Sequence, residues 1–401
     1  NETVAKVLNQ MFGGCKNGTV YGNTLITLYD GEIAHGVYGG GLGNTTTMVN
    51  GTERVSTTSA DITGCTNVFI RGGEALLKSY WRPETRSWQP ASIVNGVIYS
   101  PQYDHTKLKF NINHNIYAGG NVACTVGKNT YLTLTKGLLY NTTQMVSGRD
   151  EGKNFFESDE WREIYYKVGS PHFSVFGGGY GDSTLVKGDT YVNVSMEGRG
   201  SILQGIDIEE GKEYKHFYSG YSLMDIVGGG YSGRVMGSTH VIGAGGAFCR
   251  RVFGGGSYSS VNATDVEIKA IDCRDVFGGG FMGDVLKGTR VQIGDNTTPH
   301  AASVYSNADI FIHGDVYGGN DVSGYVNVAL NDKGYFMDNG GAGTQIDIRG
   351  GHIFGNVYGA GNGNYLFAND RNGNTKVTVN EYYPLNPNDP HTEKVPLVYT
   401  V

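Results

Sequence analysis

Aromatic side chains gather in two stretches that interrupt an otherwise repetitive sequence, residues 78–112 and 141–173, which together hold all three Trp. The side chains best suited to recognition there are Tyr80, Trp81, Trp88, Tyr103, His105, Trp161 and Tyr165. Rings of this kind, with polar groups beside them, can contact the apolar faces and the hydroxyls of a sugar. They can equally anchor a loop onto a scaffold. Glycan binding and loop packing are the two interpretations of these residues.

Polysaccharide cleavage is the catalytic chemistry that such residues would allow. A glycosidase needs two carboxylates about 5–10 Å apart, and a third interruption at residues 207–225 supplies Asp207, Glu209 and Glu210 as one partner. No second carboxylate is singled out by spacing. A lyase needs a base, for which His105 is a candidate. A carbohydrate-active enzyme is therefore the alternative to a binding protein.

Metal and cofactor motifs are incomplete in this sequence. The five Cys form no CxxC pair, which argues against a zinc site. The run from Gly178 to Asp182 resembles a calcium-binding nonapeptide, but Asp182 falls one position early and the repeat period is not nine. No Gly-rich run continues into the Gly-Lys-Ser/Thr of a phosphate loop. We expect neither a metal nor a cofactor.

The interrupted pattern is a five-residue signature of an aliphatic residue, an aromatic residue and a cluster of small residues. Its copies begin at Met11, Val37, Ile116, Val175, Ile226, Val252, Val276, Val316 and Val357. Two successive intervals are 26 residues (226 to 252) and 24 residues (252 to 276). A period in the range of about 20–50 residues indicates stacked repeats that bury their apolar faces against each other.

Between signatures lies a second phrase, a polar turn followed by alternating aliphatic residues, as in Gly188–Val194. Alternation with period two and many β-branched residues predict strands. The sequence therefore predicts an all-β chain: one elongated right-handed parallel β-helix with coils of 24–26 residues, the longer intervals being insertions or coils that have lost their signature. The solenoid should cover residues 1–380, because Pro-rich residues 381–401 indicate a linker or a following domain.

Equivalent residues of successive coils should stack, which the sequence itself can test. The residues that precede three successive signatures are Asp225, Arg251 and Asp275, so opposite charges would alternate in one column. Cys249 and Cys273 fall in another column. They form either stacked thiols or a disulfide, since stacking alone does not ensure the torsion that a disulfide needs.

Composition excludes some classes of function. The chain has 401 residues, 64 of them Gly, and a net charge of −7, which is unlike the dense Lys/Arg surface of a nucleic-acid-binding protein. No apolar run is long enough to span a membrane. The abrupt start at Asn1 suggests a mature or truncated segment of something longer.

The signature and the phrase Gly-Asn/Asp-Thr-x-Val-x-Ile, found from Met11 to about Val379, resemble the repeat region of large secreted or surface β-helical proteins of gut Bacteroidota and similar bacteria, which are adhesin-like or pectin-lyase-like. The resemblance implies an extracellular role with glycans or surface proteins as partners and neighbouring domains in the same chain. No catalytic residue can be carried over from it. An uncapped solenoid also suggests self-association end to end.

Overall fold

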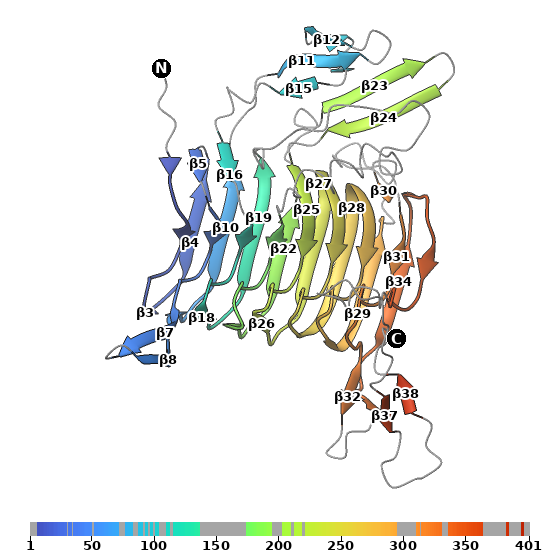
Figure 1. Ribbon diagram of the computed structural model, residues 1–401. Helices are drawn as coiled ribbons and strands as arrows, with labels where there is room; N and C mark the ends of the chain where they lie inside the picture. Colours follow the sequence, from blue (N-terminus) through green and yellow to red (C-terminus); the bar gives the residue numbers. More distant parts are fainter. Residues whose placement is uncertain are drawn as a thin grey trace.

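In the computed structural model the chain is built of strands. The structure describes residues 6–29, 31–33, 35–49, 52–71, 77–82, 87–90, 93–94, 97–98, 101–103, 110–112, 115–136, 174–194, 203–209, 212–218, 221–294, 310–312, 314–330, 336–363, 382–384 and 394–396. Every regular element in these ranges is a β-strand. The largest sheets are parallel, and successive strands lie side by side from the N-terminal to the C-terminal end of the stack (Figure 1).

The nine signatures form one continuous row of parallel strands, which we call the signature row. Its members are β2 (Met11–Phe12), β6 (Val37–Tyr38), β17 (Ile116–Tyr117), β20 (Val175–Phe176), the ends of β25 (Tyr221–Val227), β27 (Thr239–Phe253) and β28 (Val261–Phe277), β31 (Val316–Tyr317) and β36 (Val357–Tyr358). Each aliphatic residue pairs with the aliphatic residue of the next signature, from Met11↔Val37 to Val316↔Val357. The long intervals therefore contain insertions, and no rung between β2 and β36 lacks its signature.

The second phrase forms a neighbouring row in the same 17-stranded sheet. This second row consists of β4 (Thr24–Leu28), β10 (Thr66–Arg71), β19 (Thr130–Lys136), β22 (Thr190–Val194), the first parts of β27 and β28, β29 (Val285–Ile293) and β34 (Gly343–Ile348). Burial alternates along these strands, so Thr24, Ile26 and Leu28 are buried in β4 while Leu25 is exposed. The period-two pattern of the sequence thus separates an inner from an outer face.

Shorter strands complete each repeat. A five-stranded parallel sheet has the order β26 (Arg234–Val235), β21 (Ser183–Val186), β18 (Ala123–Val126), β9 (Ala60–Ile62) and β3 (Gly18–Val20). Another short row contains β1 (Lys6–Val7), β5 (Gly31–Ile33) and β16 (Phe110–Ile112). Near the C-terminal end, β30 (Phe311–Ile312) pairs with β28 and with β35 (His352–Ile353).

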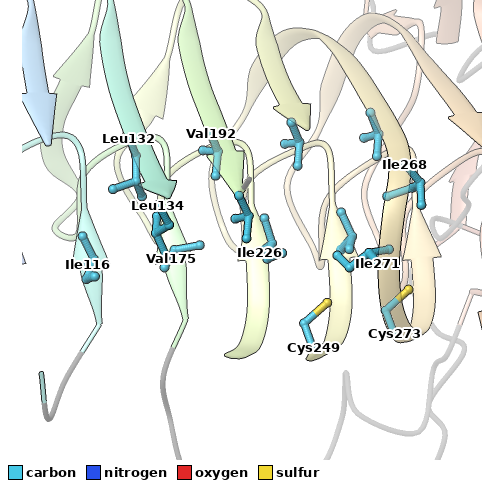
Figure 2. Close-up of a cluster of buried hydrophobic side chains, with 14 of the residues drawn as sticks. Ile116, Leu132, Leu134, Val175, Val192, Ile226, Cys249, Ile268, Ile271 and Cys273 are labelled. Carbon is cyan, nitrogen blue, oxygen red and sulfur yellow. The ribbon is translucent and has the colours of Figure 1, made fainter. Parts of the chain in front are cut away.

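The apolar interior extends along the length of the stack and does not form a single compact core. Aliphatic residues of the signature row face those of the second row, as Ile116, Leu132, Val175 and Val192 do in Figure 2. A second buried cluster contains residues of the five-stranded sheet and continues to Val261, Val285 and Val326. A third consists of the signature aromatics, from Tyr38 to Tyr317, with Val227 in the place of one ring. In the seven signatures from Val37 to Val316 both side chains are therefore buried, in separate clusters, whereas Val357 and Tyr358 of the last signature are exposed.

Buried threonines join the second row to the signature row. Thr190 donates a hydrogen bond to the carbonyl oxygen of Gly228 at 2.6 Å, and Thr264 donates to Gly278 at 2.6 Å. The same bond, from the first Thr of the second phrase to the first small residue of the signature that follows, recurs at Thr24, Thr66, Thr130, Thr239 and Thr289. Each bond satisfies a buried carbonyl, which would otherwise be costly to leave without a partner.

Close backbone packing explains the first glycine of the signature. A Cβ placed on Gly254 would lie 2.2 Å from the carbonyl oxygen of Gly278 and 2.8 Å from Cβ of Thr264. Gly228 and Gly278 meet the next repeat in the same way, with a Cβ 2.2 and 2.3 Å from a carbonyl oxygen. Only a residue without a side chain lets neighbouring backbones approach this closely.

Antiparallel hairpins and small sheets leave the parallel rows. They comprise β7 (Asn44–Val49) with β8 (Thr52–Thr58), β11 (Leu77–Arg82) with β12 (Ser87–Pro90) and β15 (Pro101–Tyr103), β13 (Ile93–Val94) with β14 (Val97–Ile98), β23 (Leu203–Glu209) with β24 (Lys212–Tyr218), β32 (Val328–Leu330) with β33 (Phe336–Asp338), and β37 (Tyr382–Pro384) with β38 (Lys394–Pro396). The last of these lies in the segment expected to follow the repeats.

Two expected insertion boundaries differ from the structure. Residues 110–112 belong to β16, which pairs with β5, so the first insertion ends before Phe110 and not at residue 112. The hairpin of the third insertion, β23–β24, begins at Leu203. The chain has rejoined the parallel row by Tyr221, which pairs with Ala247. The sequence placed these ends too late because the rejoining strands precede the recognisable signature.

Candidate functional site

Some of the antiparallel sheets that leave the repeats lie together beyond one edge of the parallel rows (Figure 1). The sequence between a second-row strand and the next signature is longest after β10, β19 and β22. Strands β11, β12 and β15, from the first of these insertions, and β23 and β24, from the third, lie on the same side of the stack (Figure 1). Strand β14 of the first contacts β23 of the third, and β24 contacts β27 of the repeats. We call this region the insertion flank.

Four of the seven residues expected to bind glycans lie on described strands of this flank. Tyr80 and Trp81 belong to β11, Trp88 to β12 and Tyr103 to β15. The antiparallel register sets Trp81 opposite Trp88. The other three, His105, Trp161 and Tyr165, lie outside the described residues.

The Asp225, Arg251 and Asp275 positions lie in one column, with Asp225 paired to Arg251 and Arg251 to Asp275 in the backbone register. The Arg251 side chain does not contact its two neighbours in this column equally. Arg251 donates from Nε and Nη2 to the two oxygens of Asp225 at 2.9 and 2.8 Å, a bidentate pair. Its Nη1 donates to Asp321 at 3.1 Å and not to Asp275. The guanidinium also lies 4.9 Å from the centroid of the Phe253 ring.

The pKa values of the two aspartates in the column therefore shift in opposite directions. Burial opposes ionisation of Asp225, but the charges of Arg251 and Arg250 outweigh it and lower the pKa of that carboxyl. Burial raises the pKa of Asp275, whose side chain accepts the backbone N–H of Asp315 at 2.9 Å. The Arg251 side chain is 17 % exposed and has two carboxylate partners. The cluster thus joins rungs together and offers little free charge to a ligand.

Cys249 and Cys273 are adjacent in the register, as expected, and both thiols are buried (Figure 2). No disulfide joins them. Of the two alternatives, the structure has stacked thiols, and they pack into the aliphatic interior as small apolar side chains.

The outer face of the second row carries a column of stacked aromatic residues that the sequence analysis did not predict. We call this column the outer row. Tyr131 stacks on Tyr191 with ring centroids 4.9 Å apart, and Tyr191 stacks on His240 at 4.7 Å. The next two residues in this column are Asp265 and Arg290. The signal was present in the sequence, since Tyr131 and Tyr191 hold the same place, after the Thr, in the repeated phrase.

Asp265 is the charged centre of this outer row. It lies 2.6 Å from Nη1 of Arg290 and 3.8 Å from Nδ1 of His240. The polar contact with His240 first, and Arg290 next, lower the pKa of Asp265 although burial acts against them. The same contact raises the pKa of His240. His240 and Asp265 therefore form an ion pair over a wider pH range than an isolated His and Asp would.

Asp265 and Glu267 form one pair of carboxylates on the outer face of the second row. They are two residues apart on one strand and so about 7 Å apart along it, within the range that glycosidases use. Both carboxylates have cationic partners, however. Asp265 has a lowered pKa, and Glu267 lies 2.8 Å from Lys269. A glycosidase needs one carboxyl whose pKa is raised, so this pair is unsuited to that reaction.

Among the described residues, no group of three or more His, Cys, Asp or Glu side chains is arranged to hold a metal ion. No helix in those ranges has the length and apolar character required to cross a membrane. Comparison of the sequence with protein-family models, with curated proteins and with solved structures finds no match.

Proposed function

We propose that the chain is an extracellular structural and adhesive segment of a larger bacterial surface protein, folded as a single right-handed parallel β-helix. In this proposal the repeats form a rigid rod, and the insertion flank presents loops to glycans or to surface proteins. The unbroken pairing of nine signatures supports the rod. The right-handed sense follows the general preference of parallel crossovers.

The main support for the proposal is that insertions from separate repeats contact each other. The first insertion leaves after β10 and the third after β22, with the β19 rung between them. Their strands β14 and β23 are nevertheless in contact. A rod of repeats needs no such layer for its own stability, since each repeat buries its interior against its neighbours. Loops that a rigid scaffold holds together are a common location for binding residues.

Glycans are one partner class because all three Trp lie in the first and second insertions. Trp81 and Trp88 are paired positions in the backbone register of β11 and β12. Aromatic residues with a polar end suit surfaces that are partly wet. Host or bacterial surface proteins are the other partner class, because the flank extends across several rungs.

A glycan array probed with the wild type and with Trp81→Ala tests this function. We expect the wild type to bind at least one glycan and Trp81→Ala to lose most of that signal. Tyr21→Ala is the matched control, because Tyr21 is 89 % exposed on the repeats and distant in sequence from the flank. A signal that Trp81→Ala and Trp88→Ala both leave intact would contradict glycan binding by this flank.

A further inference from the structure

A second set of aromatic rings lies outside the buried signature aromatics, at the turn that follows the small residues. Tyr180, Tyr231 and Phe281 occupy the same place in their repeats, since each donates its backbone N–H to the carbonyl of the third small residue one repeat earlier. In the repeat between Tyr231 and Phe281 this place is Ser257, and the ring is supplied by Tyr258. Tyr180, Tyr231, Tyr258 and Phe281 therefore place one ring in each of four successive repeats, and we call them the aromatic strip.

The strip is continuous along the stack. Ring centroids are 5.2 Å apart between Tyr180 and Tyr231, 5.1 Å between Tyr231 and Tyr258, and 5.8 Å between Tyr258 and Phe281. The interplanar angle is 25° in the first pair but 66° and 81° in the other two. Rings that cross at such angles do not cover each other's faces as a parallel stack does.

The buried signature rings hold the strip in place from beneath. Tyr231 meets Phe176 at 80° with centroids 6.0 Å apart, and Phe281 meets Phe253 at 80° and 6.3 Å. Tyr180 meets Tyr117 at 66° and 5.6 Å. These edge contacts are favourable for aromatic pairs and fix the outer rings before any ligand arrives. Such preorganisation removes part of the entropic penalty of binding.

The aromatic strip is partly exposed to solvent, and a buried polar residue takes the place of the ring at each end. Tyr180 is 43 % and Tyr258 50 % exposed, while Tyr231 and Phe281 are half-buried. The equivalent place before Tyr180 is Asn121 and that after Phe281 is Asp321, both buried polar residues. The two exposed rings contribute about 100 Å² of accessible surface each, and the other two contribute less. The total is well under the ~800 Å² per partner that a stable protein interface buries. Its length and width suit a thin linear ligand.

The groups around the strip are mostly hydroxyls. Three of its four rings are Tyr, and Ser232 and Ser257 are partly exposed in the same turns. The nearest buried cation, Arg251, lies 5.2 Å from the ring of Phe281 but is held by Asp225 and Asp321. Rings that offer faces, with hydroxyls that donate and accept, suit the alternating C–H and O–H surfaces of a sugar chain.

We propose that the aromatic strip binds a linear neutral oligosaccharide that runs parallel to the stack, with successive sugars on successive rings. The ligand class is shared with the proposed function, but the residues are different and lie on the repeats. The strip can therefore bind even where the insertion flank does not, and the reverse also holds.

Isothermal titration of the whole chain with cellohexaose, xylohexaose and laminarihexaose tests the strip, with hexagalacturonate as an anionic comparison. We expect one neutral hexasaccharide to bind, and Tyr180→Ala/Tyr258→Ala to weaken it about tenfold or more, as loss of two ring contacts implies. Tyr180→Phe/Tyr258→Phe should keep most of the affinity if ring faces dominate. Tyr21→Ala and Trp81→Ala should bind as the wild type does.

Nitration of the wild type with tetranitromethane gives a test that needs no variant. The bound hexasaccharide should protect Tyr180 and Tyr258 from nitration in peptide mass spectra and leave Tyr21 reactive. Binding that resists Tyr180→Ala/Tyr258→Ala but is lost in Trp81→Ala would overturn the strip and leave the proposed function standing. Absence of binding to every neutral hexasaccharide, or binding of hexagalacturonate alone, would also overturn it.

Discussion

Two rows of stacked aromatic rings run along the same repeats, one buried in the interior and one on the outer face of the second row. The inner row belongs to the signatures, and its ring centroids are 4.7–5.1 Å apart. The outer row is Tyr131, Tyr191 and His240, with centroids 4.9 and 4.7 Å apart. The spacing is the same because the parallel ladder sets it at about 4.8 Å whatever the side chain.

The rows differ in what surrounds the rings. Burial raises the pKa of the inner Tyr38 to about 12, and it raises that of Tyr117 as well. In the outer row the contact with the Asp265 carboxylate raises the pKa of His240 although burial acts to lower it. Stacking geometry alone therefore says little about stabilisation. The inner row should owe its strength to area removed from water, and the outer row to hydrogen bonds and charge.

The largest expected effect comes from truncating the inner row. Phe253 is 1 % exposed and stacks on Phe277 at 4.9 Å, so Phe253→Ala should lower the free energy of unfolding by about 3–5 kcal/mol. Tyr191→Ala removes a ring with the same stacking distance from the outer row and is the matched control, with an expected loss well below that. Urea unfolding followed by circular dichroism measures both. Equal losses would show that stacking, and not burial, decides stability here.

Adding one methyl group to the backbone beside the inner row should have the next largest effect. In Gly254→Ala the new Cβ would lie 2.2 Å from a backbone oxygen that cannot turn away as a side chain can. We expect a loss of about 2–3 kcal/mol in unfolding free energy. Gly359→Ala is the control, because Gly359 holds the same place in its signature and has no atom within 4 Å of a Cβ. A stable Gly254→Ala protein would mean that the rungs can separate.

Removing a hydroxyl from the interior tests the link between the rows. Thr264→Val keeps the shape but removes the donor to the Gly278 carbonyl, at an expected loss of about 1–3 kcal/mol. Thr264→Ser retains the hydroxyl and should lose less. The two variants can be compared by their urea midpoints. If Val were as stable as Thr at this position, the bond would contribute nothing net and the recurrent Thr would need another explanation.

Sequence reasoning located the repeats better than the surfaces they carry. Repetition of the signature sufficed to place Asp225, Arg251 and Asp275 in one column. It could not reveal that Arg251 turns to Asp321, because that residue follows a later signature and carries no mark of its own. The aromatic strip was missed for a related reason: the ring shifts by one place at Tyr258, which hides the column from a strict comparison of repeats.

The outer row should show the smallest effect, visible mainly as a dependence on pH. The folded-state pKa of His240 is raised, so its contribution is complete below the unfolded value of about 6.5 and disappears as pH rises through the folded value. The pKa of Asp265 is lowered, so its contribution is present above about 3.9 and disappears as pH falls through the folded value. The pair should therefore stabilise most between about pH 4 and 6.5.

The two side chains are about one-third exposed, so the stabilisation should amount to only a few tenths of a kcal/mol. The unfolding midpoint of the wild type should exceed that of His240→Asn most near pH 5–6, and the difference should shrink above neutrality. Asp189 and Glu267 also raise the pKa of His240, so Asp265→Asn should reduce the difference without removing it. NMR titration of His labelled at Cε1 should place the His240 midpoint above 6.5, and a midpoint below that would mean that burial outweighs Asp265.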